Sequence, residues 1–595
     1  MNCAAGSAQG LTRQAVFSET ELPNYGELAS TAARLARDWT VGRCAFLNHY
    51  QVCCEAEYKR RMMEQGAIMQ HAHMGFRDKL LSERAFNEIF DQTASRGAKI
   101  DRYGICLDWS MGYPADKRNG QLKGTGLILD DVEDFARLTH AAPVAAHFGD
   151  FMLGFPAALE NTQYALAAGS TVIGNLGQYF TFRLPGWSDD VATTRSTLSA
   201  IALMAAQPEE VLVHSNLDDG FAAVFQDLAC ALGAAKLECY LVETLMGGKI
   251  THCYGHHYHD PVSRFAFQKA LAKVSPRPGS MVYGNTVSYQ GNDAQNYASM
   301  AGYLLVDIIA QKYNPSGHGI NPVPVTENLR IPSMEEIINA QLAGARLVEV
   351  GLELAPFFDM TEVDRREQQL LCGGEAFFQN VLKGFEQAGI DVTDPVEMFL
   401  AIRRIGGKRL EHWFGPGEID SQSNQRTPKV ASDLFHELKQ VIQAQLHQLR
   451  DYGSSELGPK NINIVVATTD VHEHSKLVLE GVFSGLGLRV IDGGVSSDPH
   501  EVAEAAEQFN ADVIALSTYN GIALSYFGQL MDELNEKQIE VPVLIGGQIN
   551  EIPEDSESSL PVDVEGLLTE QGAVVCHQIS DAMPTLLALS NGVNE

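Results

Sequence analysis

Short apolar runs that end in polar or glycine-containing residues recur along the chain from about residue 62 to 360. Helical patterns separate them. The runs and the residues that follow them are Ala67–Met69 before Gln70–His73, Val144–Ala146 before His147–Asp150, Thr171–Ile173 before Gly174–Asn175, Val211–Val213 before His214–Asn216, Tyr240–Val242 before Glu243, and Met281–Tyr283 before Gly284–Asn285. Runs without alternation suit strands buried on both faces of a parallel sheet. About six to eight such units predict an α/β fold of the β/α (TIM-like) barrel type, with an open sheet as the alternative.

The last part of the chain alternates more regularly between short apolar runs and amphipathic segments. We predict strands at Ile462–Ala467, Leu488–Ile491, Val513–Leu516 and Val541–Ile545. We predict helices near Lys476–Leu486, Pro499–Phe509, Ser525–Glu536 and Ser580–Leu589. This alternation is typical of a flavodoxin-like, doubly wound sheet, whose ligands bind outside the carboxyl ends of the strands.

Between these parts the pattern predicts helices over 361–416 and then a polar linker, Glu418–Lys429, followed by a helix near Ser432–Asp451. The expected organisation is an N-terminal extension (1–60), a barrel with a helical tail (61–417), a linker and helix (418–458) and a C-terminal domain (459–595).

The composition suits a globular protein that binds neither nucleic acid nor membranes. The 595 residues are 45% hydrophobic, and the formal net charge is -32. An acidic surface repels phosphate backbones and anionic lipids. No secretory signal is expected in Met1–Thr20 and no membrane-spanning run is present, while the 10 Cys do not form a paired CxxC pattern. We therefore expect a cytoplasmic protein with reduced thiols.

Three features of the C-terminal domain lie where its fold places a ligand. Asp470-Val471-His472 follows the first predicted strand, Ser517 closes the third, and Gly546-Gly547 closes the fourth. A histidine can give one ring nitrogen to a metal while a carboxylate accepts the N–H of the other, which fixes the tautomer. Glycines let a bulky ligand approach the backbone. By itself, a DxH sequence after a strand is also compatible with a structural or solvated histidine.

The order of the three elements resembles the cobalamin-binding domains of mutases and methionine synthases, whose signature is DxHxxG, SxL and GG. This chain has Asp470-Val471-His472-Glu473-His474-Ser475, Ser517-Thr518-Tyr519 and Gly546-Gly547, so Ser475 replaces the glycine and Tyr519 the leucine. The resemblance implies a cobalamin whose cobalt is bound by His472, with the other cofactor contacts made by Asp470, Ser475, Ser517, Tyr519, Gly546 and Gly547. His474 is a rival ligand on the helix side.

The predicted barrel resembles the catalytic subunit of glutamate mutase. The resemblance rests on Lys99–Tyr103, Ala146–Gly149, Ala168–Thr171 and Phe414–Pro416. It implies an adenosylcobalamin-dependent isomerase (a radical mutase) that is a homodimer, with the barrel over the corrin face. In such enzymes the cobalt–carbon bond breaks homolytically, and the protein positions a small-molecule substrate and shields radicals.

The substrate is expected to be a small carboxylate or acyl compound other than glutamate. In that family, arginines clamp the two carboxylates of glutamate, and the positions that correspond to them here are near Ala72 or His73, at Ile105 and at Ala146. The position of the carboxylate that meets the amino group of glutamate is near Gly174, so this chain lacks these charged groups. Of the residues predicted at strand ends, we take His73, His147, Arg183 and Glu243 as catalytic candidates. The further pocket candidates are His71, Asp101, Arg102, Asn175 and Tyr179.

Other functions stay open at this point. A corrinoid methyltransferase is one, although only the helix Ser432–Asp451 stands where methionine synthase-type modules carry a larger helical cap. A non-catalytic cobalamin sensor or carrier is another, since the arginine clamp is missing. The cluster His252, His256, His257 and His259 with Asp260 could bind a metal or only face solvent.

Overall fold

The computed structural model describes residues 10–119, 121, 124, 126–218, 220–327, 329–420, 426–454, 457, 462–470, 473–519, 521–551 and 562–592. The chain divides into two compact units. One lies within residues 1–434, and the other lies mainly within 435–595 and also contains 182–188. In the described residues, no helix has the length and apolar character needed to cross a membrane.

Parallel strands form the centre of the first unit. Six of them form one sheet in sequence order, namely β1 (His71–Met74), β2 (Arg102–Ile105), β3 (Ala145–Phe148), β4 (Val172–Ile173), β5 (Leu212–Asn216) and β6 (Ile250–Cys253). A second sheet pairs β7 (Met281–Val282) with β8 (Gly319–Ile320). Single parallel bridges join Tyr254 to Val282 and Gln70 to Ile320, which links both edges of the smaller sheet to the larger one. The result is a mixed α/β unit with parallel sheets curved into at least half a barrel.

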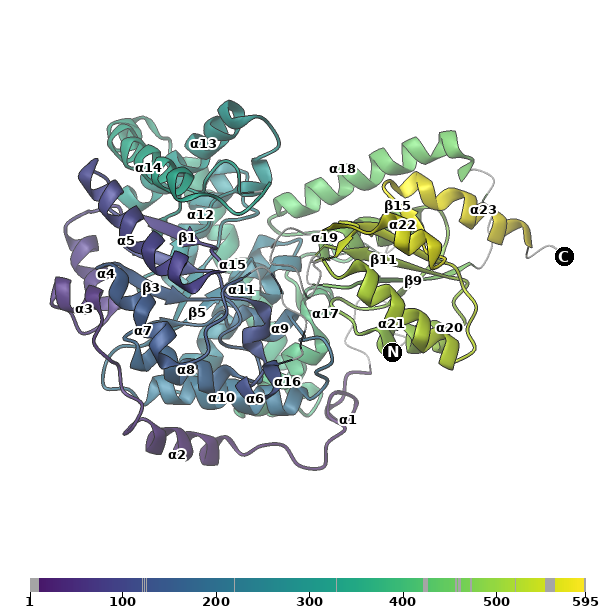
Figure 1. Cartoon of the computed structure of the whole chain (residues 1–595), viewed down its shortest axis with the longest axis horizontal. Helices are drawn as coiled ribbons and strands as arrows, with labels where there is room; N and C mark the ends of the chain where they lie inside the picture. The colour runs from purple at the N-terminus through teal and green to yellow at the C-terminus, as the bar shows by residue number, and fades with distance from the viewer. Residues whose placement is uncertain are drawn as a thin grey trace. The chain divides into compact units, whose positions relative to one another are not determined.

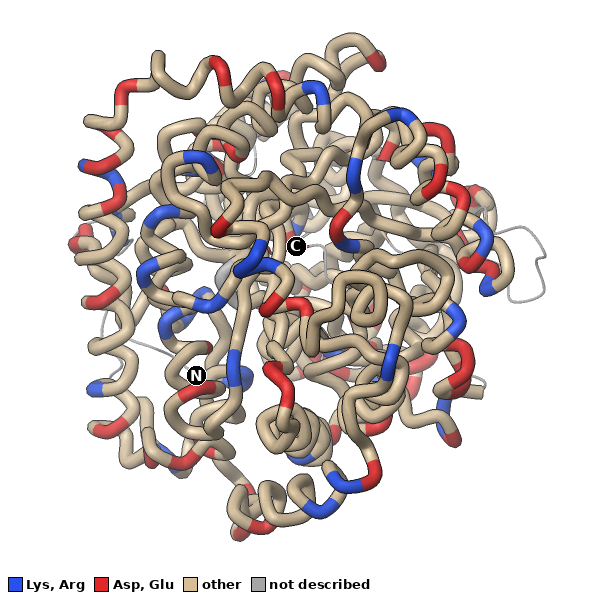
Figure 2. Tube along the Cα trace, turned by 90° about the vertical axis from the view of Figure 1, so that its left-hand side faces the viewer, with Lys and Arg blue, Asp and Glu red and all other residues tan. Residues whose placement is uncertain are grey.

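Helices follow the strands and surround them (Figure 1). They are α5 (Lys79–Ser95), α7 (Val132–Ala141), α8 (Ala158–Ala167), α10 (Asp190–Ala205), α11 (Leu228–Cys239), α12 (Pro261–Val274), α13 (Asp293–Tyr313) and α14 (Met334–Leu354). Side-chain caps start several of these helices. In α14, for example, Ser333 and Glu336 bond each other's backbone N–H in a capping box. On the side that Figure 2 shows, acidic and basic residues are interspersed.

Further helices precede and follow these strands in the first unit. The N-terminal ones are α1 (Arg13–Val16), α2 (Tyr25–Leu35), α3 (Ala45–Tyr50) and α4 (Glu55–Glu64). After α14 come α15 (Thr361–Gln387), α16 (Pro395–Ile405) and α17 (Gly407–Phe414), as the sequence predicts for 361–416. Short helices α6 (Ala115–Arg118) and α9 (Gly177–Thr181) lie in loops that follow β2 and β4.

Several strands of the first unit lie further along the chain than predicted. His71, His73, His147 and His214 were expected in loops, but they lie within strands. Three of these polar side chains, His73, His147 and His214, line a cavity inside the unit. The strand predicted at Tyr240–Val242 is wrong, since Tyr240–Leu245 form a π-helix and the sixth strand begins at Ile250.

The second unit is a five-stranded parallel sheet in the order β10-β9-β11-β12-β15. Its strands are β9 (Asn463–Thr468), β10 (Arg489–Asp492), β11 (Val513–Thr518), β12 (Val543–Gly547) and β15 (Val574–Cys576), and β13 (Asn550–Glu551) pairs with β14 (Val562–Asp563) separately. The predicted flavodoxin-like order is confirmed. All residues of β11 are buried, because helices cover both faces of the sheet. The sequence missed β15, which has only three residues.

The helices of this unit match the predicted segments closely, except that α22 was not predicted. They are α18 (Asp433–Gln448), α19 (Glu473–Gly485), α20 (Pro499–Phe509), α21 (Ala523–Glu536), α22 (Glu565–Glu570) and α23 (Met583–Gly592). A 3-10 turn, Leu449–Tyr452, extends α18. His472, the predicted cobalt ligand, and Val471 lie outside the described residues.

Candidate functional site

The strand order of the second unit reverses between β9 and β11, and the loops after these strands are tied together. The backbone N–H of Tyr519 donates to the Asp470 carboxylate over 2.6 Å, and Asp470 is 3% exposed. The Thr469 N–H donates to Ser517 O at 3.0 Å. Open parallel sheets bind ligands at this switch point. Asp470 therefore ties the loop after β9 to the loop after β11.

A cavity of about 490 Å³ lies beside the carboxyl ends of β11 and β12. Its wall is largely apolar, with Val478, Leu479 and Phe483 from α19 and Leu544 and Ile545 from β12. The polar groups in the wall are Gln445, His474, Ser475, Ser517, His577 and Gln578. An apolar cavity with a few polar groups at its rim suits a large organic ligand.

Two glycines let backbone segments come close at the edge of this cavity. Gly547 has a φ of +109°, and a Cβ there would lie 2.2 Å from Thr518 O. A Cβ on Gly546 would lie 2.8 Å from Cys576 O. Thr518 O already accepts a hydrogen bond from the Gln548 N–H at 2.8 Å, so it is not free to move away. Glycine is therefore required at 547 for conformation and at both positions for space.

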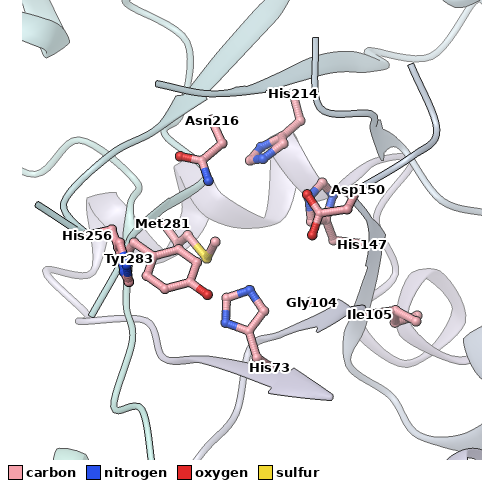
Figure 3. Close-up of a pocket in the computed structure, with 11 residues that line it drawn as sticks. His73, Gly104, Ile105, His147, Asp150, His214, Asn216, His256, Met281 and Tyr283 are labelled. Carbon is pink, nitrogen blue, oxygen red and sulfur yellow. The ribbon is translucent and has the colours of Figure 1, made fainter. Parts of the chain in front are cut away.

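A second cavity, of about 90 Å³, lies inside the first unit (Figure 3). Its wall comprises His73, Gly104, Ile105, His147, Gly149, Asp150, His214, Asn216, His256, Met281 and Tyr283. In Figure 3, His73 and Tyr283 face His147, Asp150 and His214 across the open space. The parallel strands thus enclose a small chamber rich in imidazole groups.

Burial keeps these imidazoles neutral. It lowers the pKa of His73 to about 3 and that of His256 to about 4, and it places the pKa values of His147 and His214 well below the ordinary value. In each case desolvation is the largest cause, and positive neighbours such as Arg102 act in the same direction for three of the four histidines. The cavity therefore offers neutral hydrogen-bonding groups at neutral pH.

Residues 460–572 match the family model of the B12 binding domain. Cobalamin binding by the second unit is thus supported. This match confirms the resemblance predicted from Asp470, Ser517 and Gly546-Gly547.

Glutamate mutase sigma subunit 2 of Haloarcula marismortui is 28% identical to the chain over 90 residues, which is 15% of this chain. The chain spans 61% of that relative's length. Two solved structures are also similar. A cobalamin-binding protein of Desulfitobacterium hafniense has a TM-score of 0.20 and 21% identity, over 26% of this chain and 69% of the other. The methanol:cobalamin methyltransferase complex of Methanosarcina barkeri has a TM-score of 0.19 and 15% identity, over 42% and 74%.

In the B12-binding domain, the structure brings together four of the predicted cofactor contacts. Ser475, Ser517, Gly546 and Gly547 all line the larger cavity, whereas Tyr519 is 51% exposed and does not line it. His474 also lines it and stands 3.7 Å from Glu437. The sequence analysis missed the apolar wall of α19. The spacing of Ser475, Leu479 and Phe483, four residues apart, places them on one helix face and was the available signal.

Of the predicted catalytic residues, His73 and His147 line the smaller cavity, and Arg183 and Glu243 do not. Arg183 lies in the second unit, where it is 3.4 Å from Glu501. Glu243 lies on the π-helix and pairs with Arg277 at 3.2 Å. The sequence analysis missed Asp150, His214 and Tyr283 as cavity residues, although each stands at or just after a predicted strand end.

The other pocket candidates have structural contacts. Arg102 pairs with Glu55 at 3.0 Å, and its Nη1 lies 3.3 Å from Nδ1 of His71. Asp101 accepts a hydrogen bond from the Gln70 N–H, and the Tyr179 hydroxyl bonds Thr194 in the core. Asn175 approaches the cavity residue Asp150, with 3.4 Å between the Asn175 Nδ2 and Asp150 Oδ1 atoms.

The predicted histidine cluster begins within β6 and continues into the loop after it, and its members lie in different surroundings. His252 is buried and bonds Glu238 and Ser275, while His256 faces the smaller cavity. His257 lies 3.6 Å from Asp218 and His259 2.9 Å from Asn285. Within the described parts of the chain, no three or more His, Cys, Asp or Glu side chains are grouped so that they could hold a metal.

Proposed function

We propose that the protein is a cobalamin-dependent isomerase, an adenosylcobalamin-dependent mutase that rearranges the carbon skeleton of a small substrate. One observation carries the proposal. A B12-binding domain and a strand-enclosed chamber lined by neutral histidines occur in the same chain. Radical chemistry needs a chamber that excludes water and side reactions, and parallel strands with buried, uncharged walls can provide one.

We further propose that the eight strands of the first unit form one closed β/α barrel. The bridges from Tyr254 to Val282 and from Gln70 to Ile320 support closure in the cyclic order β1 to β8. Active sites of such barrels lie at the carboxyl ends of the strands. Asp150 and Asn216 stand at those ends of β3 and β5 and line the cavity, which is where a substrate would bind.

The described residues of the B12-binding domain fit a cobalamin. The larger cavity can take a bulky apolar group between α19 and the sheet, and Gly547 removes the Cβ that would block its edge. We propose His472 as the cobalt ligand and Asp470 as the residue that positions its loop, since the Asp470 carboxylate anchors the Tyr519 N–H. When bound, adenosylcobalamin supplies a carbon-centred radical by homolysis of its cobalt–carbon bond.

Within the chamber we propose His73 and His147 as substrate contacts, and we do not assign Arg183 or Glu243 to it. Nδ1 of His147 donates to Val172 O at 3.0 Å, because a carbonyl oxygen can only accept. Nε2 of the neutral ring is then an acceptor. His73 Nδ1 lies 3.2 Å from Asn321 Nδ2, which orients that ring. These residues position a substrate by hydrogen bonds without a charge of their own.

A turnover experiment tests the proposed reaction. The full chain is incubated with adenosylcobalamin and, separately, with methylcobalamin, together with a panel of small amino acids and acyl compounds. We expect a product of unchanged mass and altered carbon skeleton, seen by NMR. We also expect a radical signal in EPR in the samples that contain substrate and adenosylcobalamin, and not in those with methylcobalamin. Methyl transfer from methylcobalamin to a thiol, without isomerisation of any compound, would instead establish a corrinoid methyltransferase.

A further inference from the structure

Charged side chains lie at both ends of the strands in the first unit. Lys59 and Arg102 lie at the amino ends of the strands, where both contact the buried carboxylate of Glu55. Lys59 also donates to Ser280 O, just before β7. In the loops at the carboxyl ends, three carboxylates follow β3, β5 and β8, namely those of Asp150, Asp218 and Glu327. Of these charged residues, Asp150 lines the cavity, whereas Lys59, Arg102, Asp218 and Glu327 do not.

The cavity wall itself includes no Lys or Arg among the described residues. Its histidines are neutral at pH 7 because burial lowers their pKa values. Arg77, in the loop after β1, lies close enough to Asp108 to lower the pKa of that carboxyl, and it does not line the cavity. Among the described wall residues, Asp150 is thus the one that can carry a charge at neutral pH.

Asp150 has only weak support from its protein neighbours. Its Oδ1 atom lies 3.4 Å from Asn175 Nδ2 and 3.4 Å from Gln178 Nε2, which is long for hydrogen bonds. Burial raises the pKa of the Asp150 carboxyl. An ionised carboxylate in such a place gains stability from a cationic partner that the wall does not supply.

The residue beside Asp150 is also an acceptor. In Figure 3, His147 lies on the same side of the cavity as Asp150. The Nδ1–H of His147 is used by Val172 O, which leaves Nε2 with a lone pair next to Gly149. A protonated amine has N–H donors in several directions and can satisfy a carboxylate and an imidazole nitrogen together.

We propose that this cavity binds a small ligand through a protonated amino group held by Asp150, with His147 as a second acceptor. The volume of about 90 Å³ limits the ligand to a few heavy atoms at this site. A dicarboxylate does not fit, because the wall offers no cation for either carboxylate. The inference rests on the proposed function only in naming this ligand the substrate of the cobalamin-dependent enzyme.

Three probes of equal length test the proposal on the full chain without cobalamin. They are propylammonium chloride, sodium propionate and 1-propanol, with binding measured by ligand-observed NMR titration at neutral pH. We expect saturable binding of propylammonium and at least tenfold weaker binding of the other two. Asp150→Asn, which keeps size and polarity, should weaken propylammonium binding at least tenfold. Asp116→Asn, an exposed substitution on α6, should leave binding unchanged.

The thermal transition of Asp150→Asn shows whether that variant folds, and the comparison of probes on the wild-type chain stands without it. Propionate binding as tightly as propylammonium, or wild-type affinity for propylammonium in a folded Asp150→Asn variant, would overturn the proposal. Hydroxocobalamin binding is measured separately by absorbance. Amine binding without cobalamin binding would reject the proposed function alone, and the reverse result would reject this inference alone.

Discussion

Acidification from about pH 7.5 to about pH 5 is expected to destabilise the first unit by several kcal/mol. Desolvation holds the pKa of His73 at about 3 and that of His256 at about 4 in the folded protein, and those of His147 and His214 well below the ordinary value. In the unfolded chain each imidazole titrates near about 6.5. The unfolded state therefore takes up protons first as the pH falls.

The sign of the effect follows from these directions. The stability contributed by each neutral histidine is fully present above the unfolded pKa and is lost as the pH falls toward the folded one. Below about pH 6.5 each buried imidazole removes about 1.4 kcal/mol of unfolding free energy per pH unit. The lower limit of the window for His256 is about 4 and for His73 about 3. Several such groups in one unit make the loss steep.

Thermal unfolding followed by circular dichroism at a series of pH values measures this loss. His147→Gln should unfold with a shallower dependence on pH below about 6.5, by about one proton. His140→Gln is the control, because His140 is exposed on α7, and this variant should follow the wild type. Equal pH dependence in the wild type and in a folded His147→Gln variant would contradict the assignment of a buried neutral imidazole.

Gly547→Ala is expected to weaken cobalamin binding at least tenfold and to destabilise the B12-binding domain. The φ of +109° is a conformation that alanine rarely adopts, and the new Cβ would lie 2.2 Å from Thr518 O. Backbone strain of this kind costs about 1–3 kcal/mol before the steric overlap is counted. To relieve the overlap, β11 has to move away from β12. Ser517 on β11 and Gly546 on β12 would then separate at the edge of the larger cavity.

Titration with hydroxocobalamin, followed by absorbance, measures the binding. Gly528→Ala provides a matched control on α21, where a Cβ would meet nothing within 4 Å. That variant should bind normally and unfold at a slightly higher temperature, since alanine is favoured over glycine in a helix by about 0.5–1 kcal/mol. Wild-type affinity in Gly547→Ala would show that the edge formed by Gly546 and Gly547 does not touch the cofactor.

The second unit could be predicted from its sequence because local and tertiary signals agree there. Strands such as Val513–Thr518 are continuous apolar runs, and α20 begins with Pro499 and a capping box between Asp498 and Glu501. The three-residue strand β15 has too little pattern to be recognised, and its place at the sheet edge depends on pairing with β12. The strand β15 is thus an element that long-range pairing creates.

The first unit was harder to predict because polar residues face its interior. The rule that apolar runs form strands placed His71, His147 and His214 after their strands, whereas they lie within them. Tyr240–Val242 is as apolar as a strand, but it continues α11 as a π-helix whose burial explains the composition. The residues of the smaller cavity come from several strands and loops, and their convergence depends on strand register, which the sequence pattern does not specify.

The central claim is that the imidazole of His472 binds cobalt in the B12-binding domain. The most direct test is the EPR spectrum of Co(II) cobalamin bound to the full chain, prepared with unlabelled and with ¹⁵N-labelled histidine. We predict nitrogen hyperfine splitting that changes with the label in the wild type and in His474→Ala. In His472→Ala the spectrum should no longer depend on the label. A spectrum that the histidine label does not alter, and that is the same in wild type and His472→Ala, would contradict the account.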